Sequence, residues 1–207
     1  MTTRRTFIKN TAVTAAGIGL TGSLTGTLAS CSANDRINIG LIGCNGMGFS
    51  NLRAFLQHPE VDCLALCDVD ETVLNTRAAN VEKIRGQKPA FLYKDWRKVI
   101  DNKDIDLVII GTPDHWHCLQ MIAACEAGKD VYCEKPMGRT IEENNLMVKA
   151  AEKYKRVVQV GQWQRSDPHW LDSVNFIRSG KLGKIRLVRV YSYQGWNNSI
   201  PVVPDEN

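Results

Sequence analysis

One stretch of sequence decides the fold: residues 37–48 read INIGLIGCNGMG. The first six residues are an apolar run typical of a buried strand, and a glycine-rich turn follows them. Residues 49–58 then have the pattern of a helix that ends before Pro59. A strand, a glycine turn and a helix in this order leave free backbone N–H groups at the start of the helix, where they can bind the diphosphate of a dinucleotide.

The turn matches the dinucleotide-binding pattern GxGxxG at two of its three glycines. Gly43 and Gly48 occupy the first and third positions, and Asn45 occupies the second. Asparagine tolerates positive φ better than most residues, but its side chain adds bulk near the phosphates. An ordinary glycine loop is the alternative for this turn taken alone. In the dinucleotide interpretation Gly43, Asn45, Gly46, Met47 and Gly48 contact the cofactor.

A carboxylate follows the second predicted strand. Residues 61–67 are apolar and end at Asp68, twenty residues after Gly48. A carboxylate there can accept hydrogen bonds from both hydroxyls of an adenosine ribose and repels a 2′-phosphate, which favours NAD over NADP. The alternative is that Asp68 caps the next helix. Asp70 can serve as that cap for a helix over residues 70–85, which leaves Asp68 for the ribose.

Strands and helices alternate through the rest of this part of the chain. The pattern predicts strands at 91–93, 106–111, 131–133 and 157–161, and helices at 95–101, 115–127 and 140–154. Thr140 and Glu143 form a predicted capping box. The alternation is typical of an α/β fold, a doubly wound parallel sheet with helices on both faces. We therefore expect one domain over residues 32–161.

The last part of the chain has a different pattern. Residues 168–179 are predicted to be a helix, and the alternating residues 185–193 a strand of a different type. Residues 162–207 are thus expected to be a crossover and the incomplete beginning of an α+β C-terminal domain.

Two further motifs lie where predicted strands end. Thr112-Pro113-Asp114-His115-Trp116-His117 follows residues 106–111, and Glu134-Lys135-Pro136 follows residues 131–133. Ligands of open α/β sheets bind at the carboxyl ends of the strands. The alternatives are packing at a helix start for His115 and His117, and a surface lysine before a turn for Lys135.

These four motifs, in this order, resemble the Gfo/Idh/MocA family of oxidoreductases over about residues 37–194. The resemblance implies a Rossmann domain followed by a second domain with an open sheet. It implies a cis peptide before Pro136 and an active-site role for Lys135. His117 matches the histidine that closes the family's Thr-Pro segment. Gln162 and Trp163 resemble the family's segment after the sixth strand, which borders cofactor and substrate.

The resemblance also implies an activity. Hydride would pass between a bound NAD(P) and a sugar, polyol or glycoside. Catalytic roles fall to Lys135 and His117, and the remaining cofactor contacts to Thr112, Pro113, His115, Glu134, Gln162 and Trp163. A related branch implies a glycosidase that oxidises C3 transiently and breaks the glycosidic bond by elimination. In the family, the acid–base histidine lies on a helix of the second domain, and this sequence lacks that helix. The third alternative is therefore a fragment that binds a nucleotide but has no activity.

The first 31 residues have the features of an export signal. Thr3-Arg4-Arg5-Thr6-Phe7-Ile8-Lys9 resembles a twin-arginine motif, and Leu28-Ala29-Ser30-Cys31 resembles a lipobox. Residues 11–28 are too polar for a good transmembrane helix. We expect export by the twin-arginine route, with a lipid on Cys31 as the membrane contact. The alternatives are cleavage near Ala33, which gives a soluble periplasmic product, and a disordered basic N-terminus.

The composition narrows the partners. The 207 residues are 43% hydrophobic and 23% charged, which is typical of a globular protein. Without the three basic residues of the leader, 23 Lys and Arg face 22 Asp and Glu, so nothing favours a nucleic-acid partner. The seven cysteines form no CxxC pair, so no metal site is expected, and Cys63 and Cys67 are expected in the core. A homo-oligomer is expected for the full-length protein.

Overall fold

The computed structural model describes residues 36–191. The chain divides into a segment of residues 1–36 and a unit of residues 37–207. The twin-arginine and lipobox predictions concern residues 1–31 and so lie outside the described part. Within residues 36–191, no helix has the length and apolar character needed to cross a membrane.

Six parallel strands form one sheet in the order β3-β2-β1-β4-β5-β6. The order reverses direction between β1 and β4, which is where a doubly wound sheet opens a crevice at the carboxyl ends of its strands. The predicted parallel α/β fold is confirmed. The strands are β1 (Ile37–Ile42), β2 (Val61–Cys67), β3 (Phe91–Tyr93), β4 (Leu107–Ile110), β5 (Asp130–Cys133) and β6 (Val158–Val160).

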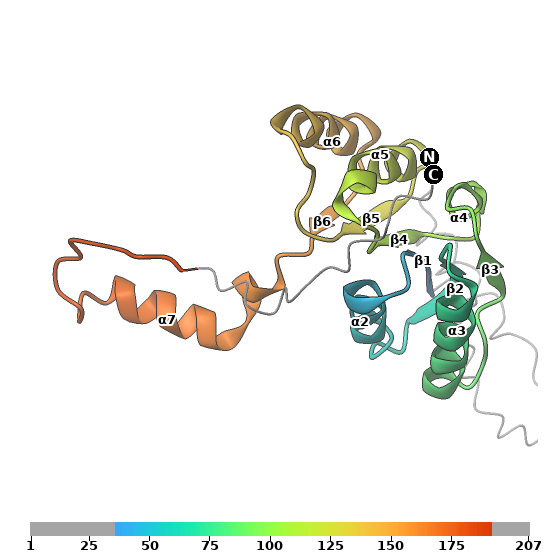
Figure 1. Cartoon of the computed structure of the whole chain (residues 1–207), viewed down its shortest axis with the longest axis horizontal. Coiled ribbons are helices and arrows are strands. Elements are labelled where there is room, and N and C mark those ends of the chain that lie inside the picture. The colour runs from blue at the N-terminus through green and yellow to red at the C-terminus, as the bar shows by residue number, and fades with distance from the viewer. Residues whose placement is uncertain (1–35, 192–207) are drawn as a thin grey trace, which may run out of the picture. The chain divides into compact units, whose positions relative to one another are not determined.

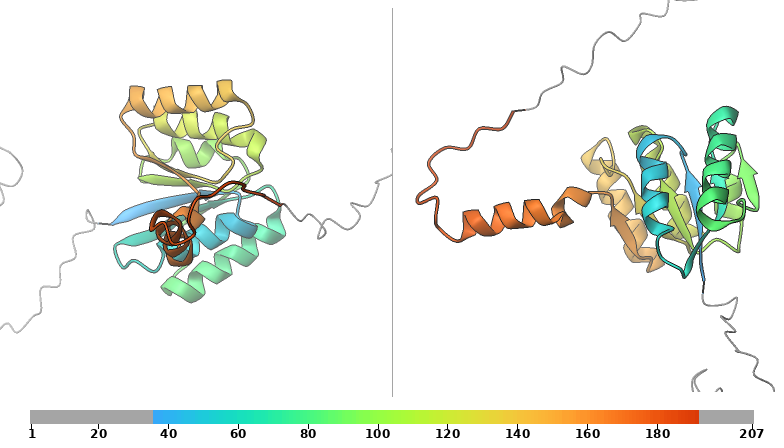
Figure 2. Two further views of the ribbon diagram at one scale, coloured as in Figure 1. Left: turned by 90° about the vertical axis from the view of Figure 1, so that its left-hand side faces the viewer. Right: turned by 90° about the horizontal axis from the view of Figure 1, so that it is seen from below.

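Helices cover both faces of the sheet (Figures 1 and 2). One face carries α2 (Gly46–Phe55) and α3 (Glu71–Arg85), and the other carries α5 (His117–Glu126) and α6 (Ile141–Tyr154). The short helix α4 (Arg97–Asp101) packs into the same core as α5 and α6. Two 3₁₀ turns, Asp114–Trp116 and Trp163–Ser166, precede α5 and α7 (Pro168–Arg178).

The sheet separates two hydrophobic cores. Leu41 and Ile109 point to the side of α2 and α3, whereas Ile42 and Ile110 point to the side of α5 and α6. This alternation follows from the period of two residues in a strand. Each of these side chains is at most 2% exposed, and burying one contributes roughly 1.5–3 kcal/mol. Strands buried on both faces explain the unbroken apolar runs of the sequence.

The cysteines of the described part are free, and all but Cys118 are buried. Cys63 and Cys67 lie in the cores, as expected from the sequence. Burial is the main cause that raises the pKa of each of these two thiols to about 12. They are therefore protonated packing groups rather than nucleophiles.

Local side-chain contacts set the helix boundaries. The Asp70 carboxylate accepts hydrogen bonds from the backbone N–H groups of Thr72 (2.8 Å) and Val73 (3.2 Å), so it caps α3. Thr140 Oγ1 accepts from the Glu143 N–H at 3.2 Å. The Glu143 carboxylate accepts from the Arg139 N–H instead of that of Thr140, so the expected capping box is half formed.

The end of the described part differs from the prediction. Residues 185–191, predicted as part of a strand over 185–193, are in no strand. A strand needs a neighbour for its backbone hydrogen bonds, and the six-stranded sheet of residues 37–160 does not extend to them. The helix α7 carries no buried residue.

Candidate functional site

Three glycines bring the ends of β1 and β4 into backbone contact. Gly43 has a φ of +83°, and a Cβ atom on it would lie 2.6 Å from the carbonyl carbon of Gly111. A Cβ atom on Gly111 would lie 2.5 Å from the Cα of Gly48, in the first turn of α2. No side chain fits between these segments. The start of α2 therefore lies directly above the carboxyl ends of β1 and β4, where its N–H groups can bind an anion.

Asn45, at the second glycine position, has an ordinary extended backbone with φ −92° and ψ 163°. The positive φ that an asparagine tolerates is not used at Asn45 and occurs at Gly46 instead (+50°). The Asn45 Oδ1 atom accepts a hydrogen bond from the Gly46 N–H at 2.9 Å. This cap starts α2 at Gly46, three residues earlier than predicted.

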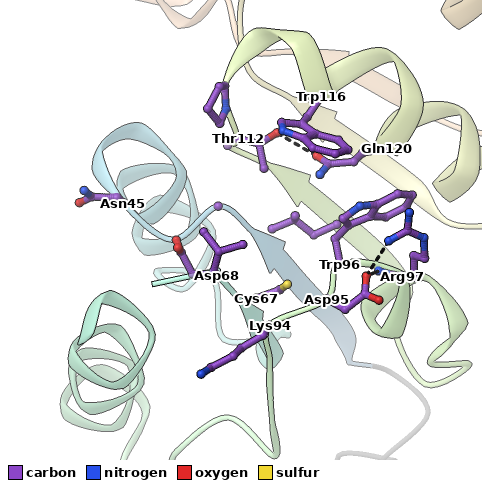
Figure 3. Close-up of a pocket in the computed structure, with 15 residues that line it drawn as sticks. Asn45, Cys67, Asp68, Lys94, Asp95, Trp96, Arg97, Thr112, Trp116 and Gln120 are labelled. Carbon is purple, nitrogen blue, oxygen red and sulfur yellow. Dashed lines mark hydrogen bonds and ion pairs between the residues drawn. The ribbon is translucent and has the colours of Figure 1, made fainter. Parts of the chain in front are cut away.

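Arg77 of α3 stabilises the glycine turn through hydrogen bonds. Its Nε donates to the Cys44 carbonyl (3.2 Å), and its Nη2 donates to Asn45 Oδ1 (3.3 Å). Its guanidinium also lies 4.6 Å from the centre of the Phe49 ring. In Figure 3 the Asn45 side chain points away from the other residues drawn. The bulk expected near the phosphates is thus directed away from the crevice.

Asp68 joins the turn to the end of β2. Its Oδ2 accepts a hydrogen bond from the Cys44 N–H at 2.7 Å, and its Oδ1 accepts one from the Asp70 N–H at 3.0 Å. Because Asp70 caps α3, Asp68 is free of that task, as the sequence suggested. Two backbone donors fix the carboxylate, and each oxygen keeps a lone pair for a ligand.

The segment after β3 forms one side of the site, here called the wall, and it was not predicted from the sequence. Residues 94–97, Lys-Asp-Trp-Arg, follow the strand directly, and the Arg97 guanidinium lies 5.0 Å from the centre of the Trp96 ring. Their position directly after a predicted strand could have identified them, because ligands of parallel sheets bind at the carboxyl ends of the strands.

These segments enclose a cavity of about 540 Å³ (Figure 3). It opens at the carboxyl ends of the strands, at the point where the strand order reverses. The size is in the range of small-ligand pockets. The lining comprises Ile42, Gly43, Asn45, Cys67, Asp68, Val69, Lys94, Asp95, Trp96, Arg97, Gly111, Thr112, Pro113, Trp116 and Gln120.

Some residues of the segment after β4 line this cavity and others do not. Thr112 lines it, and its Oγ1 donates to the buried Gln120 Oε1 at 2.8 Å. Trp116 is 38% exposed and also lines it. His115 is exposed and is not among the lining residues.

His117 has a different environment from the one a catalytic residue needs. It is 1% exposed. Its Nε2 lies 2.8 Å from the Thr112 carbonyl oxygen, and its Nδ1 lies 2.7 Å from that of Pro136. A neutral ring donates to one of these carbonyls and a ring with two N–H groups donates to both. Both nitrogens face backbone carbonyls, so the ring joins two turns and has neither nitrogen directed into the cavity.

The segment after β5 places a lysine beside a buried carboxylate. The Lys135-Pro136 peptide is cis, as the resemblance implied. Glu134 is 5% exposed; its Oε1 accepts from Asn51 Nδ2 of α2 (2.8 Å) and its Oε2 from the Lys135 N–H (3.0 Å). Lys135 itself is exposed. The motif thus anchors its backbone inside the protein and presents its lysine at the surface.

The remaining predicted contacts lie apart from the cavity. Met47, Gln162 and Trp163 are exposed and are not among its lining residues. Gly161, just before Gln162, packs against Glu134, so a Cβ atom there would lie 2.6 Å from Glu134 Oε1. Among residues 36–191, no group of three His, Cys, Asp or Glu side chains could hold a metal ion.

Comparison with known proteins identifies relatives of this part of the chain. The sequence model of an oxidoreductase family with an NAD-binding Rossmann fold matches residues 37–162. A levoglucosan dehydrogenase from Pseudarthrobacter phenanthrenivorans is 33% identical over 165 residues, which are 78% of this chain and 42% of the relative. A glycosyl hydrolase family 109 protein from Shewanella putrefaciens is 30% identical over 154 residues, 73% of this chain and 34% of the relative.

A solved structure supports the same relationship. The WlbA dehydrogenase from Chromobacterium violaceum, in complex with NADH and UDP-GlcNAcA, is 27% identical with a TM-score of 0.62, over 73% of this chain and 42% of that one. The chain spans about a third of the length of the first curated relatives it matches.

The glycine contacts predict a large effect of one methyl group. Gly48→Ala should lower the free energy of unfolding by about 2–4 kcal/mol, because its Cβ would overlap the Gly43 carbonyl oxygen. Urea denaturation of the purified chain measures this. Ser50→Ala in the same helix is the control and should change stability by less than about 0.5 kcal/mol. Equal effects of the two substitutions would contradict the close backbone contact.

The two histidines of the segment after β4 should differ in their effect on stability. His117→Ala should cost about 2–4 kcal/mol, because it removes a buried ring and leaves the Thr112 and Pro136 carbonyls without their partner. His115→Ala, at an exposed position, should change it by less than about 0.5 kcal/mol. Chemical denaturation compares the two, and a stable His117→Ala variant would refute the structural role.

Proposed function

The chain belongs to the Gfo/Idh/MocA family of oxidoreductases, which have an NAD-binding Rossmann fold, and on this premise we propose that the whole protein transfers hydride between NAD and a sugar, polyol or glycoside. The observation that carries the proposal is the fixed Asp68 carboxylate. It lies at the end of β2, beside the cavity and hydrogen-bonded to the glycine turn. A carboxylate there can accept hydrogen bonds from both adenosine ribose hydroxyls.

The residues present fit the cofactor. The cavity would hold the adenosine part, with Asp68 for the ribose and the ring of Trp96 for the base. The backbone at the start of α2, where the three glycines leave no side chains, would hold the diphosphate. Thr112 and Pro113, which line the cavity after β4, would contact the cofactor. These assignments support NAD rather than NADP, because Asp68 repels a 2′-phosphate.

The chemistry divides between cofactor and protein. When bound, NAD supplies a hydride acceptor, and the protein supplies orientation and proton transfer. Lys135 Nζ is the group of the described residues that can orient a substrate hydroxyl or relay its proton. Glu134 fixes the Lys135 backbone through its Oε2, and His117 fixes the following turn through the Pro136 carbonyl. In this proposal His117 positions the site and Lys135 acts in it.

A second candidate function is hydrolysis of a glycoside without net change in the cofactor. The relative named as a glycosyl hydrolase family 109 protein favours it. Such a reaction needs no supply of free NAD, which suits an exported protein that retains its cofactor.

We also propose the export that the first 31 residues suggest, by the twin-arginine route with a lipid on Cys31. The proposal rests on the motifs around Arg4, Arg5 and Cys31. Replacing Arg4 and Arg5 by lysine should leave the protein in the cytoplasm. Cys31→Ser should release it from membranes. Unchanged fractionation of these variants would refute the route and the anchor.

Three outcomes of one experiment separate the functions. The full-length protein is incubated with sugars, polyols and nitrophenyl glycosides, without added NAD, while nitrophenol and NADH absorbance are recorded. NADH formed with a free sugar or polyol supports the dehydrogenase. Nitrophenol release without net NADH supports the glycosidase. If the protein binds the cofactor but converts none of these compounds, the result supports a nucleotide-binding function without catalysis.

Asp68→Ala should weaken NAD binding by about tenfold to a hundredfold, because charge-assisted hydrogen bonds to the ribose are lost. Calorimetry on the purified protein measures the dissociation constant. Asp104→Ala, which changes an exposed acid near the opposite ends of the strands, is the control and should leave it unchanged. Equal NAD affinities of the Asp68 variant and the parent would overturn the assignment.

A further inference from the structure

A lysine lies next to the carboxylate proposed to bind the ribose. Cys67 and Tyr93 are the last register pair of β2 and β3, and the Asp68 N–H donates to the Tyr93 carbonyl at 3.1 Å. Asp68 and Lys94 are the residues that follow this pair on the two strands. Both line the cavity (Figure 3). The sheet register therefore brings a cation to the place where a cofactor 2′-phosphate would need one.

That cation is already paired. Lys94 Nζ lies 2.7 Å from Glu71 Oε2, at the first residue of α3. The hydrogen bond and the charge of Lys94 lower the pKa of the Glu71 carboxyl, in that order of size, so the carboxylate is ionised at neutral pH. The second cation of the lining, Arg97, lies 3.2 Å from the Asp95 carboxylate. Each cation of the cavity lining thus has an acidic partner.

The position of Glu71 directs the lysine toward α3. The two side chains are 63% and 67% exposed, so the pair adds little to stability. Its effect on a ligand is larger than its effect on folding, because a phosphate competes for the same ammonium group. Asp68 repels that phosphate. Glu71 holds the Lys94 ammonium group in an ion pair, so this positive charge is not available to the phosphate.

Resting on the proposed NAD site, we infer that Glu71 is a specificity-determining residue, which discriminates against NADP by holding Lys94 in an ion pair. The inference adds a second element to the Asp68 repulsion. NAD, which has no 2′-phosphate, does not engage Lys94, so its affinity is independent of the pair.

The test compares NAD and NADP dissociation constants for the parent, Glu71→Gln, Lys94→Ala and the double variant, by calorimetry at low salt. Glu71→Gln should lower the ratio of the NADP to the NAD constant about fivefold, through tighter NADP binding. The double variant should lose this gain, because it lacks the released ammonium group. An unchanged ratio in Glu71→Gln, or a gain that persists in the double variant, overturns the inference.

A matched control lies on the same helix. Glu82 of α3 pairs with Lys88 at 3.7 Å, and neither residue lines the cavity. Glu82→Gln should leave the ratio unchanged, and a shift equal to that of Glu71→Gln would show a general charge effect and refute the inference. If the parent binds NAD and Glu71→Gln does not change the ratio, only this inference fails. If the parent binds neither nucleotide, the proposed function fails with it.

Discussion

Backbone contact among three glycines is the constraint on which the site depends. Gly43 and Gly111 directly follow β1 and β4, Gly48 lies in the first turn of α2, and no Cβ atom fits between them. Their contact fixes the first turn of α2 above the point where the strand order reverses. The N–H groups that can receive an anion are thus set by the fold and not by flexible side chains. Binding then requires little ordering of the protein, which preserves affinity.

The Asp68 carboxylate extends this rigidity to the next strand. Its hydrogen bond to the Cys44 N–H ties the end of β2 to the glycine turn, and its bond to the Asp70 N–H ties it to the start of α3. The same side chain therefore supports the turn and faces the cavity. Hydrogen bonds to an ionised acceptor are stronger than neutral ones, so one carboxylate holds the turn, β2 and the start of α3 together at the edge of the cavity.

The sequence predicted those parts that depend on local pattern. The bounds of β1 and β2 agree with the prediction because both strands are buried on two faces and read as continuous apolar runs. Asp70 was identified as the cap of α3 by its position alone. The start of α2 was missed, because it depends on one hydrogen bond that the Asn45 side chain accepts from the Gly46 N–H. The wall around Trp96 was missed, because it follows a strand of only three residues whose neighbours are known only from the sheet order.

The burial of His117 could not be predicted, because its second partner is a carbonyl 19 residues away. Through that ring the turn after β4, which lines the cavity, is linked to the turn that carries Lys135. The two turns come from separate crossovers, yet they can shift only together. Diversification of substrate preference within such a scaffold should then proceed by exchanging side chains on this joined unit, since moving one turn alone would break the hydrogen bonds of His117 that connect the two turns.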